Sequence, residues 1–131
     1  MKTIEIKTSC RSEMINITAQ IKNIIKESGI KDGICVLYVP HTTAGVTINE
    51  CADPDVVCDM TSFLNSLIPQ MSSFRHGEGN SDAHIKASLI GFSQHLIIDG
   101  GKPELGTWQG IFFFEFDGPR TRKLHVKIIK N

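Results

Sequence analysis

The sequence has no surplus charge of either sign, because 14 lysines and arginines are balanced by 14 aspartates and glutamates. A general nucleic-acid binder needs excess basic side chains to displace counterions from phosphates, so we expect no DNA or RNA partner. No apolar stretch approaches the roughly 18 residues typical of a membrane span. Residues 1–7 also lack the apolar segment of a signal peptide. We therefore expect a cytoplasmic protein without a membrane partner.

Cysteine is scarce, and its spacing points to no redox or metal motif, because no two cysteines form a C-x-x-C pair. A chain of 131 residues, 40% of them hydrophobic, can bury a core without disulfides. The interpretation is a single globular domain over residues 1–131. A zinc site is the weaker alternative to small packing residues for the four cysteines, Cys10, Cys35, Cys51 and Cys58.

Apolar periodicity predicts a mixed α+β order of elements. Strands are expected at residues 3–9, 33–39, 45–49, 95–98, 111–116 and 123–130. Helices are expected at residues 13–28, 54–68 and 81–90, the first capped by Ser12 and the second by Asp53. The turn residues 117–119 (Asp-Gly-Pro) indicate that the last two strands form a hairpin.

Polar residues suited to chemistry gather in loops, and the loop at residues 75–80 is the most informative. Its glycines let backbone amides approach a ligand, and the helix that follows directs its N-terminal amides at the same space. A phosphate would suit this place. The residues expected to hold it are Arg75, Gly77, Gly79, Asn80, Ser81 and Lys86. The alternative is a plain helix entry in which the glycines serve only the turn.

Three histidines, His41, His76 and His84, lie at loops or helix starts. Together with nearby carboxylates they supply the ligand types of a divalent metal such as Mg²⁺ or Zn²⁺. Their spacing matches no metal motif, so proton transfer or hydrogen bonding is the alternative role for each. In either case we expect the three imidazoles to converge in one pocket.

Several short blocks, taken together, resemble the YjbQ-type family. Each block alone is weakly specific, whereas their joint occurrence in the family's order is highly specific. The blocks cover the chain from about residue 35 to its end and read His41-Thr42-Thr43-Ala44-Gly45, Asn49-Glu50, Asp53-Pro54, His76, Asn80-Ser81-Asp82-Ala83-His84-Ile85-Lys86-Ala87, Leu105-Gly106-Thr107-Trp108-Gln109 and Glu115-Phe116-Asp117-Gly118-Pro119-Arg120.

The resemblance implies an α+β fold, an antiparallel β-sandwich or distorted barrel flanked by helices, assembled as a homotrimer. It also implies a weak, secondary thiamine-phosphate synthase activity. This reaction joins a hydroxymethylpyrimidine diphosphate to a thiazole phosphate and releases pyrophosphate, so the partner is a small phosphorylated metabolite. The residues to which the resemblance assigns the site are His41, His76 and His84, with Glu50, Asn80, Asp82 and Lys86 around them.

Two functional classes remain open. A transferase needs a cation-lined or metal-assisted seat for the leaving pyrophosphate, which Arg75, Lys86 and the third helix start would supply. The sequence shows no obvious nucleophile paired with a base. This keeps open the alternative, a module that binds phosphate, metal or a small metabolite and has only incidental catalytic activity.

Further expectations concern packing. The run at residues 111–116 is too apolar for one sheet face, so we expect it or its neighbours to form the trimer interface. Trp108 is expected in the core or at an interface. Lys86 lies four residues after Asp82, so it either forms a surface ion pair or reaches back to an anion above Gly79.

Overall fold

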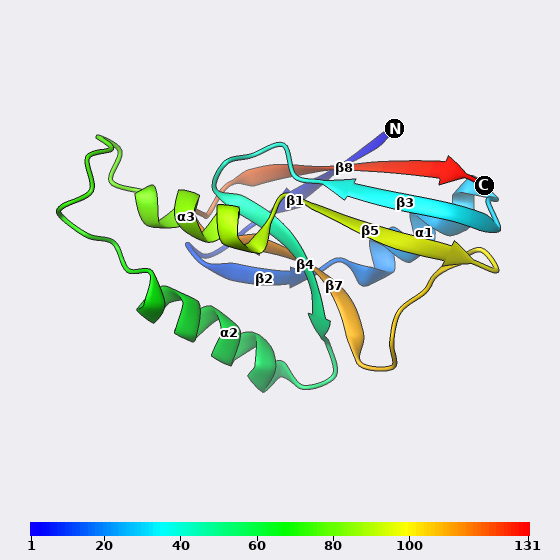
Figure 1. The fold of residues 1–131 in the computed structure, drawn as a ribbon, viewed down its shortest axis with the longest axis horizontal. Coiled ribbons are helices and arrows are strands. Elements are labelled where there is room, and N and C mark those ends of the chain that lie inside the picture. The colour runs from blue at the N-terminus through cyan, green and yellow to red at the C-terminus, as the bar shows by residue number, and fades with distance from the viewer.

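The computed structural model describes residues 1–131 and shows two curled antiparallel sheets with three helices (Figure 1). The mixed α+β class expected from the sequence is confirmed. The strands are β1 (Lys2–Lys7), β2 (Glu13–Asn16), β3 (Asp32–Tyr38), β4 (Ala44–Glu50), β5 (Ser93–Asp99), β6 (Lys102–Pro103), β7 (Gln109–Glu115) and β8 (Thr121–Lys130). The helices are α1 (Thr18–Ser28), α2 (Pro54–Leu67) and α3 (Ser81–Ile90).

The larger sheet has the strand order β1-β8-β3-β5-β6, and every pairing in it is antiparallel. Along β8, Leu124 and Val126 are buried whereas Lys123 and Lys127 are exposed, as expected for a strand with one covered face. The main core lies against that face. It also contains the isoleucines of α1, namely Ile21, Ile24 and Ile25.

The smaller sheet has the order β2-β7-β4, so β7 is its central strand. Both faces of β7 are covered, since Phe112 and Phe114 are as buried as Ile111 and Phe113. The expected interface role of the Ile111–Phe116 run is therefore wrong for these residues, because the chain itself covers both sides. Their apolar density reflects a central strand between two core clusters.

The expected hairpin between β7 and β8 is also wrong. β7 pairs with β2 and β4, while β8 pairs with β1 and β3 in the other sheet. The turn at residues 117–119 carries the chain from one sheet to the other. A second correction concerns residues 13–16, which form β2 and not the first turn of a helix. The helix begins at Thr18. The backbone N–H of Thr18 donates a hydrogen bond to the side chain of Asn16, and Ser12 does not cap the helix.

Helix α3 packs on β4, and Gly45 permits the close approach. The amide of Val46 donates a hydrogen bond to the carbonyl of Gly91, just after α3, at 3.2 Å. A β-carbon at position 45 would lie 2.7 Å from that same oxygen. The contact fixes α3 across the end of the smaller sheet, where both polar cavities described below lie.

Helix α2 begins as expected, with the Asp53 carboxylate accepting a hydrogen bond from the Asp55 amide at 2.9 Å. None of its residues is buried, and it stands apart from the sheets in Figure 1. Large apolar side chains on and after it are exposed, among them Phe63, Leu67 and Met71.

Three further side chains differ in burial from expectation. Trp108 is 62% exposed, so it is no core residue of this chain. Cys35 is buried, which raises the pKa of its thiol to about 11. The other three cysteines are free and exposed, and the packing role expected for them is wrong. No helix combines the length and the apolar character needed to cross a membrane.

Candidate functional site

A polar cavity of about 370 Å³ lies where the segment after β3, the start of α3 and the β7–β8 connection meet. We call it the histidine cavity. No hydrophobic residue lines it, and its lining residues are His41, Thr42, Thr43, His76, Glu78, Asn80, His84, Asp117, Arg120 and Arg122. The structure thus brings His41, His76 and His84 to one place, although the first is remote from the others in sequence.

His41 is held by the backbone of β8. Its Nε2 accepts a hydrogen bond from the amide of Lys123 at 2.9 Å, which assigns the remaining ring proton to Nδ1. Burial lowers the pKa of His41, and the positive charge of Arg122 lowers it further. A neutral imidazole with one fixed nitrogen is suited to donate a hydrogen bond or to accept a proton once that bond is released.

His76 and His84 face each other across the cavity mouth. Their ring centroids lie 5.5 Å apart and their planes are nearly perpendicular, at 88°. His76 comes from the exposed loop before α3, and half-buried His84 comes from the first turn of α3. Both rings are therefore reachable from solvent, and His41, which is likewise half-buried, is the one fixed by a backbone hydrogen bond.

The floor of the cavity is a buried ion pair between Arg122 and Glu115, which are 2% and 0% exposed. Glu115 also accepts hydrogen bonds from the Thr8 hydroxyl at 2.8 Å and from the backbone amides of Phe116 and Asp117, both at 3.1 Å. Burial alone would raise the pKa of Glu115, but these donors, Arg122 first, hold it below its usual value. Both partners are therefore charged at neutral pH.

One nitrogen of Arg122 remains free. Its Nε and Nη2 bond Glu115, and Nη2 also donates to the Thr43 hydroxyl at 2.7 Å. Nη1 makes no hydrogen bond within the chain. It is also not fully buried, because Asn80 Oδ1 is the one buried side-chain polar atom without a partner. Because Arg122 lines the histidine cavity, Nη1 is the part of the guanidinium that a ligand can reach.

The cavity rim contains a chain of polar contacts. Asn80 donates through Nδ2 to Asp117 at 2.8 Å, and Arg120 donates to the same carboxylate at 3.2 Å. Asn80 Oδ1 is the one buried side-chain polar atom without a partner. Asn80 is the residue before α3, and its side chain makes no capping bond, so the amides of Ser81 and Asp82 have no partner in the chain. These amides are donors of the kind that bind anions.

Several predicted site residues lie elsewhere. Glu50 ends β4, whereas β4 starts three residues after His41, so the strand separates them by about 20 Å at roughly 3.3 Å a residue. Arg75, Gly77 and Gly79 line neither this cavity nor the next one. The amide of Gly79 donates to the carbonyl of His76 at 3.0 Å, and its φ is +73°. Its role is therefore the turn, and not an anion contact.

Asp82 and Lys86 line a second polar cavity of about 360 Å³, which we call the lysine cavity. Its other lining residues are Arg11, Ser12, Asn65, Pro69 and Gln70. Lys86 is 1% exposed and donates to Asp82 at 3.1 Å and to Asn65 at 2.8 Å. The expected i,i+4 ion pair of Lys86 with Asp82 is confirmed, but it is buried and not on the surface. The ammonium group points into this buried network, so Lys86 does not line the histidine cavity beside the start of α3.

The fit of a metal ion to the histidines is poor. No group of three or more His, Cys, Asp or Glu side chains is arranged to hold a metal ion. His41 already uses Nε2 for the Lys123 amide. The three imidazoles share a cavity but do not form a ligand set, and we derive no step through a resident metal.

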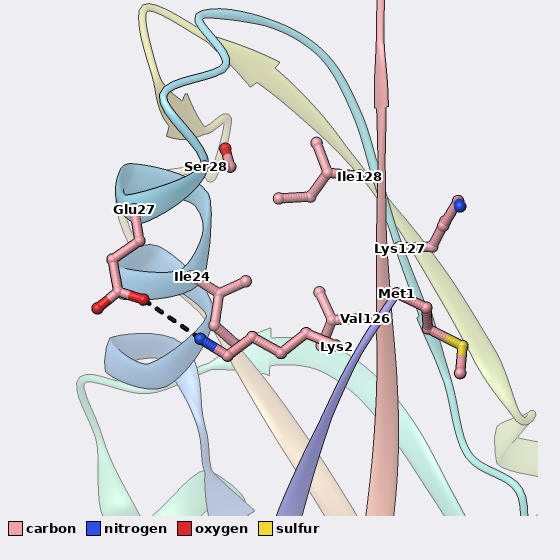
Figure 2. A pocket seen from close by; sticks show the side chains of 8 residues that line it. All are labelled: Met1, Lys2, Ile24, Glu27, Ser28, Val126, Lys127 and Ile128. Carbon is pink, nitrogen blue, oxygen red and sulfur yellow. Dashed lines mark hydrogen bonds and ion pairs between the residues drawn. The ribbon is translucent and has the colours of Figure 1, made fainter.

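Other hollows have less to offer chemically. A shallow one between α1 and the β1–β8 pair is bordered by the surface ion pair of Lys2 and Glu27 at 3.2 Å (Figure 2). Both side chains are more than half exposed, so this pair contributes little. The largest hollow, about 830 Å³, lies beside α1 and β6 and contains no histidine or carboxylate.

A small α+β domain with curled antiparallel sheets and a polar, histidine-lined cavity is the class that fold and site define. Residues 2–131 match the family described as UPF0047 protein YjbQ-like, and the chain belongs to this family. It is 63% identical to a UPF0047 protein of Methanocaldococcus jannaschii over 95% of this chain and 91% of the relative. It is 51% identical to the UPF0047 protein YugU of Bacillus subtilis over 98% of both chains.

Solved structures agree. The crystal structure of an uncharacterized YjbQ/UPF0047 protein of Clostridium acetobutylicum is 54% identical, has a TM-score of 0.96, and is matched over 98% of this chain and 100% of that one. A YjbQ-like protein of unknown function from Sulfolobus solfataricus is 33% identical with a TM-score of 0.94, over 99% and 96% of the two chains. These relatives establish family and fold, so the activity has to be argued from the site.

Proposed function

We propose that the histidine cavity binds the phosphate portion of a small metabolite and that the protein is a transferase of the thiamine-phosphate synthase type. The observation that carries the proposal is the free Nη1 of Arg122 at the cavity floor. Glu115 fixes this guanidinium in place, so its accessible nitrogen is oriented before a ligand arrives. The half-exposed Arg120, which lines the same cavity, adds a further donor.

In the proposed reaction, the thiazole nitrogen attacks the methylene carbon of the pyrimidine diphosphate. A carbon–nitrogen bond forms as the carbon–oxygen bond breaks, and pyrophosphate leaves with the electron pair. The protein stabilises the negative charge that grows on the leaving group through the donors named above. His76 or His84 supplies a proton to it. Mg²⁺ would arrive with the diphosphate, whose oxygens are its preferred ligands.

The second candidate is a binding module for a small anion. The wholly polar lining of the histidine cavity favours it, because such walls suit a phosphate better than two aromatic rings. In this case any synthase activity is incidental, and the histidines serve only as hydrogen-bond partners.

A turnover assay with a matched control separates the two. The purified protein is given both substrates with Mg²⁺, and release of pyrophosphate is measured for the wild type, His84→Gln and His95→Gln. His95 is exposed on β5 and lies outside the cavity, so it is the control. We expect His84→Gln to lose about 100-fold or more in rate. Absence of saturable pyrophosphate release by the wild type would rule out the transferase and leave the binding module, whereas equal rates in the two variants would assign the proton to His76.

The assembly and location implied by the family resemblance are proposed as well. A homotrimer would cover the exposed apolar side chains of α2, Phe63 and Leu67. Light scattering of the wild type should then give three times the chain mass, and a monomer would contradict the assembly. The free, exposed thiols of Cys10, Cys51 and Cys58 support a reducing compartment such as the cytoplasm.

A further inference from the structure

The lysine cavity and the histidine cavity lie on opposite faces of α3. Asn80 and His84 are four residues apart and border one cavity, whereas Asp82 and Lys86, also four apart, border the other. Positions two apart on a helix differ by about 200° in direction, so the two pairs point away from each other. The lysine cavity is therefore a separate place with its own chemistry.

This second cavity contains one positive charge more than it contains negative ones. Arg11 binds the Asp82 carboxylate with two hydrogen bonds, at 2.9 and 3.0 Å, and Lys86 binds the same carboxylate at 3.1 Å. Asp82 and Lys86 are each 1% exposed, and Arg11 is only partly exposed. Two cations thus share one carboxylate. Burial of an uncompensated charge is costly, so the arrangement calls for a further negative group.

The next acidic neighbour is used by the other cavity. Asp117 is close enough to act on Arg11 electrostatically. Its carboxylate, however, accepts from Asn80 and Arg120 on the histidine side. Asp117 therefore does not supply the missing counter-charge beside Lys86.

In the lysine cavity, the hydrogen-bonding groups of Arg11, Asp82, Lys86 and Asn65 that remain without a partner are donors. Both oxygens of Asp82 are occupied, and Asn65 Oδ1 accepts from Lys86 and from the Ser12 hydroxyl at 3.0 Å. Lys86 has three N–H groups and two partners in the chain, and the Arg11 guanidinium has five N–H groups of which two are bonded. The Asn65 amide nitrogen donates to nothing in the chain. The cavity thus offers several donors around an excess positive charge.

We propose that the lysine cavity is a second anion site, which binds a phosphate or carboxylate group of a small molecule between Arg11, Lys86 and the Asn65 amide. The ligand supplies the charge that Asp82 alone does not balance. Gln70 and Ser12, the neutral polar members of the lining, complete the contacts to a protonated oxygen if the anion has one.

Asn65 provides the sharpest test because its side chain is exposed and touches Lys86 directly. Asn65→Asp places a carboxylate on the lysine ammonium and cancels the excess charge without removing any buried group. Asn65→Ala removes the same amide and leaves the charge excess, so it is the matched control. Arg120→Gln alters only the histidine cavity and marks the first site.

Isothermal titration calorimetry with inorganic phosphate, and separately with citrate, measures the sites in all four proteins. We expect two phosphates per chain in the wild type. Asn65→Asp should weaken one of them at least about tenfold, whereas Asn65→Ala should weaken it less and Arg120→Gln should weaken the other. If the affinities of the four proteins for citrate follow the same order as those for phosphate, the site accepts carboxylate groups. If only phosphate binds there, the site is restricted to phosphate.

Two results would overturn the proposal. One is that phosphate binds at the second site of Asn65→Asp as tightly as it does at that site of Asn65→Ala. The other is a single site per chain that responds to Arg120→Gln alone. Neither depends on turnover, so a failure of the synthase assay leaves this test intact, and a failure here leaves the synthase assay intact.

Discussion

The two cavities flanking α3 differ in how they use buried charge. On the histidine side, Arg122 and Glu115 form a one-to-one pair, and three imidazoles line the same cavity. On the lysine side, Asp82 is shared by two cationic side chains, those of Arg11 and Lys86. The first arrangement suits proton transfer, and the second suits permanent attraction of an anion.

The difference also extends to stability. Removing the cation on the histidine side leaves Glu115 buried without a charged partner. Removing Lys86 on the other side leaves Asp82 with both hydrogen bonds from Arg11. Replacing the buried cation should therefore reduce the stability of the protein more on the histidine side than on the lysine side.

The largest effect is expected for Arg122→Met. A buried carboxylate that loses its ion-pair partner costs about 3–5 kcal/mol. Glu115 would keep the Thr8 hydroxyl and two backbone amides, which are insufficient to replace a cation. Urea unfolding followed by circular dichroism measures the loss. The double variant Arg122→Met, Glu115→Gln should be more stable than Arg122→Met, because it no longer contains a buried carboxylate without a cationic partner. A double variant that is less stable would contradict this explanation.

A smaller loss is expected for Lys86→Met, about 1–3 kcal/mol by the same measurement. The methionine fills similar space, and Asp82 keeps its bidentate partner Arg11. The loss exceeds that of a surface ion pair, because Lys86 is only 1% exposed. Equal losses of stability for Lys86→Met and Arg122→Met would show that the second cation, Arg11, does not reduce the cost of losing Lys86. The two cavities would then not differ in this respect.

Gly45→Ala tests whether both cavities depend on the position of α3. The added methyl would meet the Gly91 carbonyl at 2.7 Å and the Ile90 side chain at 3.2 Å. Helix α3 must then shift on β4, at a cost of about 1–3 kcal/mol. Phosphate binding should weaken at both sites together. Gly77→Ala, where nothing lies near the added methyl, is the control and should leave stability and binding unchanged.

The strands and helices that the sequence predicted correctly are those marked by local signals, which are apolar runs, alternation along a strand, or cap and stop residues around a helix. β3, β5, β8, α2 and α3 all lie within a residue or two of the expected positions. The failures involve information that is not local. Met14 and Ile17 fit a helical stripe with Ile21, yet β7 needs a neighbour and takes residues 13–16 as a strand. The partner of β8 is likewise decided by sheet closure and not by the turn before it.

The candidate site was predictable in part. The three histidines do line one cavity, but Arg122 was missed because a basic residue alternating with apolar ones usually faces solvent. A signal was present at its partner. Glu115 stands between Phe114 and Phe116 in an apolar run, so its carboxylate had to be buried and had to find a cation. Helix geometry also indicated that Lys86 could not share a face with His84, since the two are only two positions apart in the sequence.

The smallest effect is expected from the titration of His41. Burial and the charge of Arg122 lower its pKa in the folded protein below the ordinary value of 6.5. The unfolded chain therefore binds the proton first as pH falls, so the contribution to stability is fully present above about pH 6.5 and is lost as pH drops through the lower folded pKa. Protonation of Nε2 would also break the bond from the Lys123 amide.

The measurement is the free energy of unfolding between pH 8 and pH 5 for the wild type and for His41→Asn, which cannot titrate. The difference between the two curves should fall as pH is lowered. The carboxylates Glu115 and Asp82 do not interfere, because their lowered pKa values place their losses below the ordinary values of 4.5 and 3.8. No such loss is expected from Asp82 and Arg11 on the lysine side, because the pKa of Asp82 is lowered and that of Arg11 is raised, both away from this window. Parallel curves for the two proteins would mean that His41 is not held neutral by its surroundings, and would contradict the role of a neutral hydrogen-bond donor derived for it from the Lys123 contact.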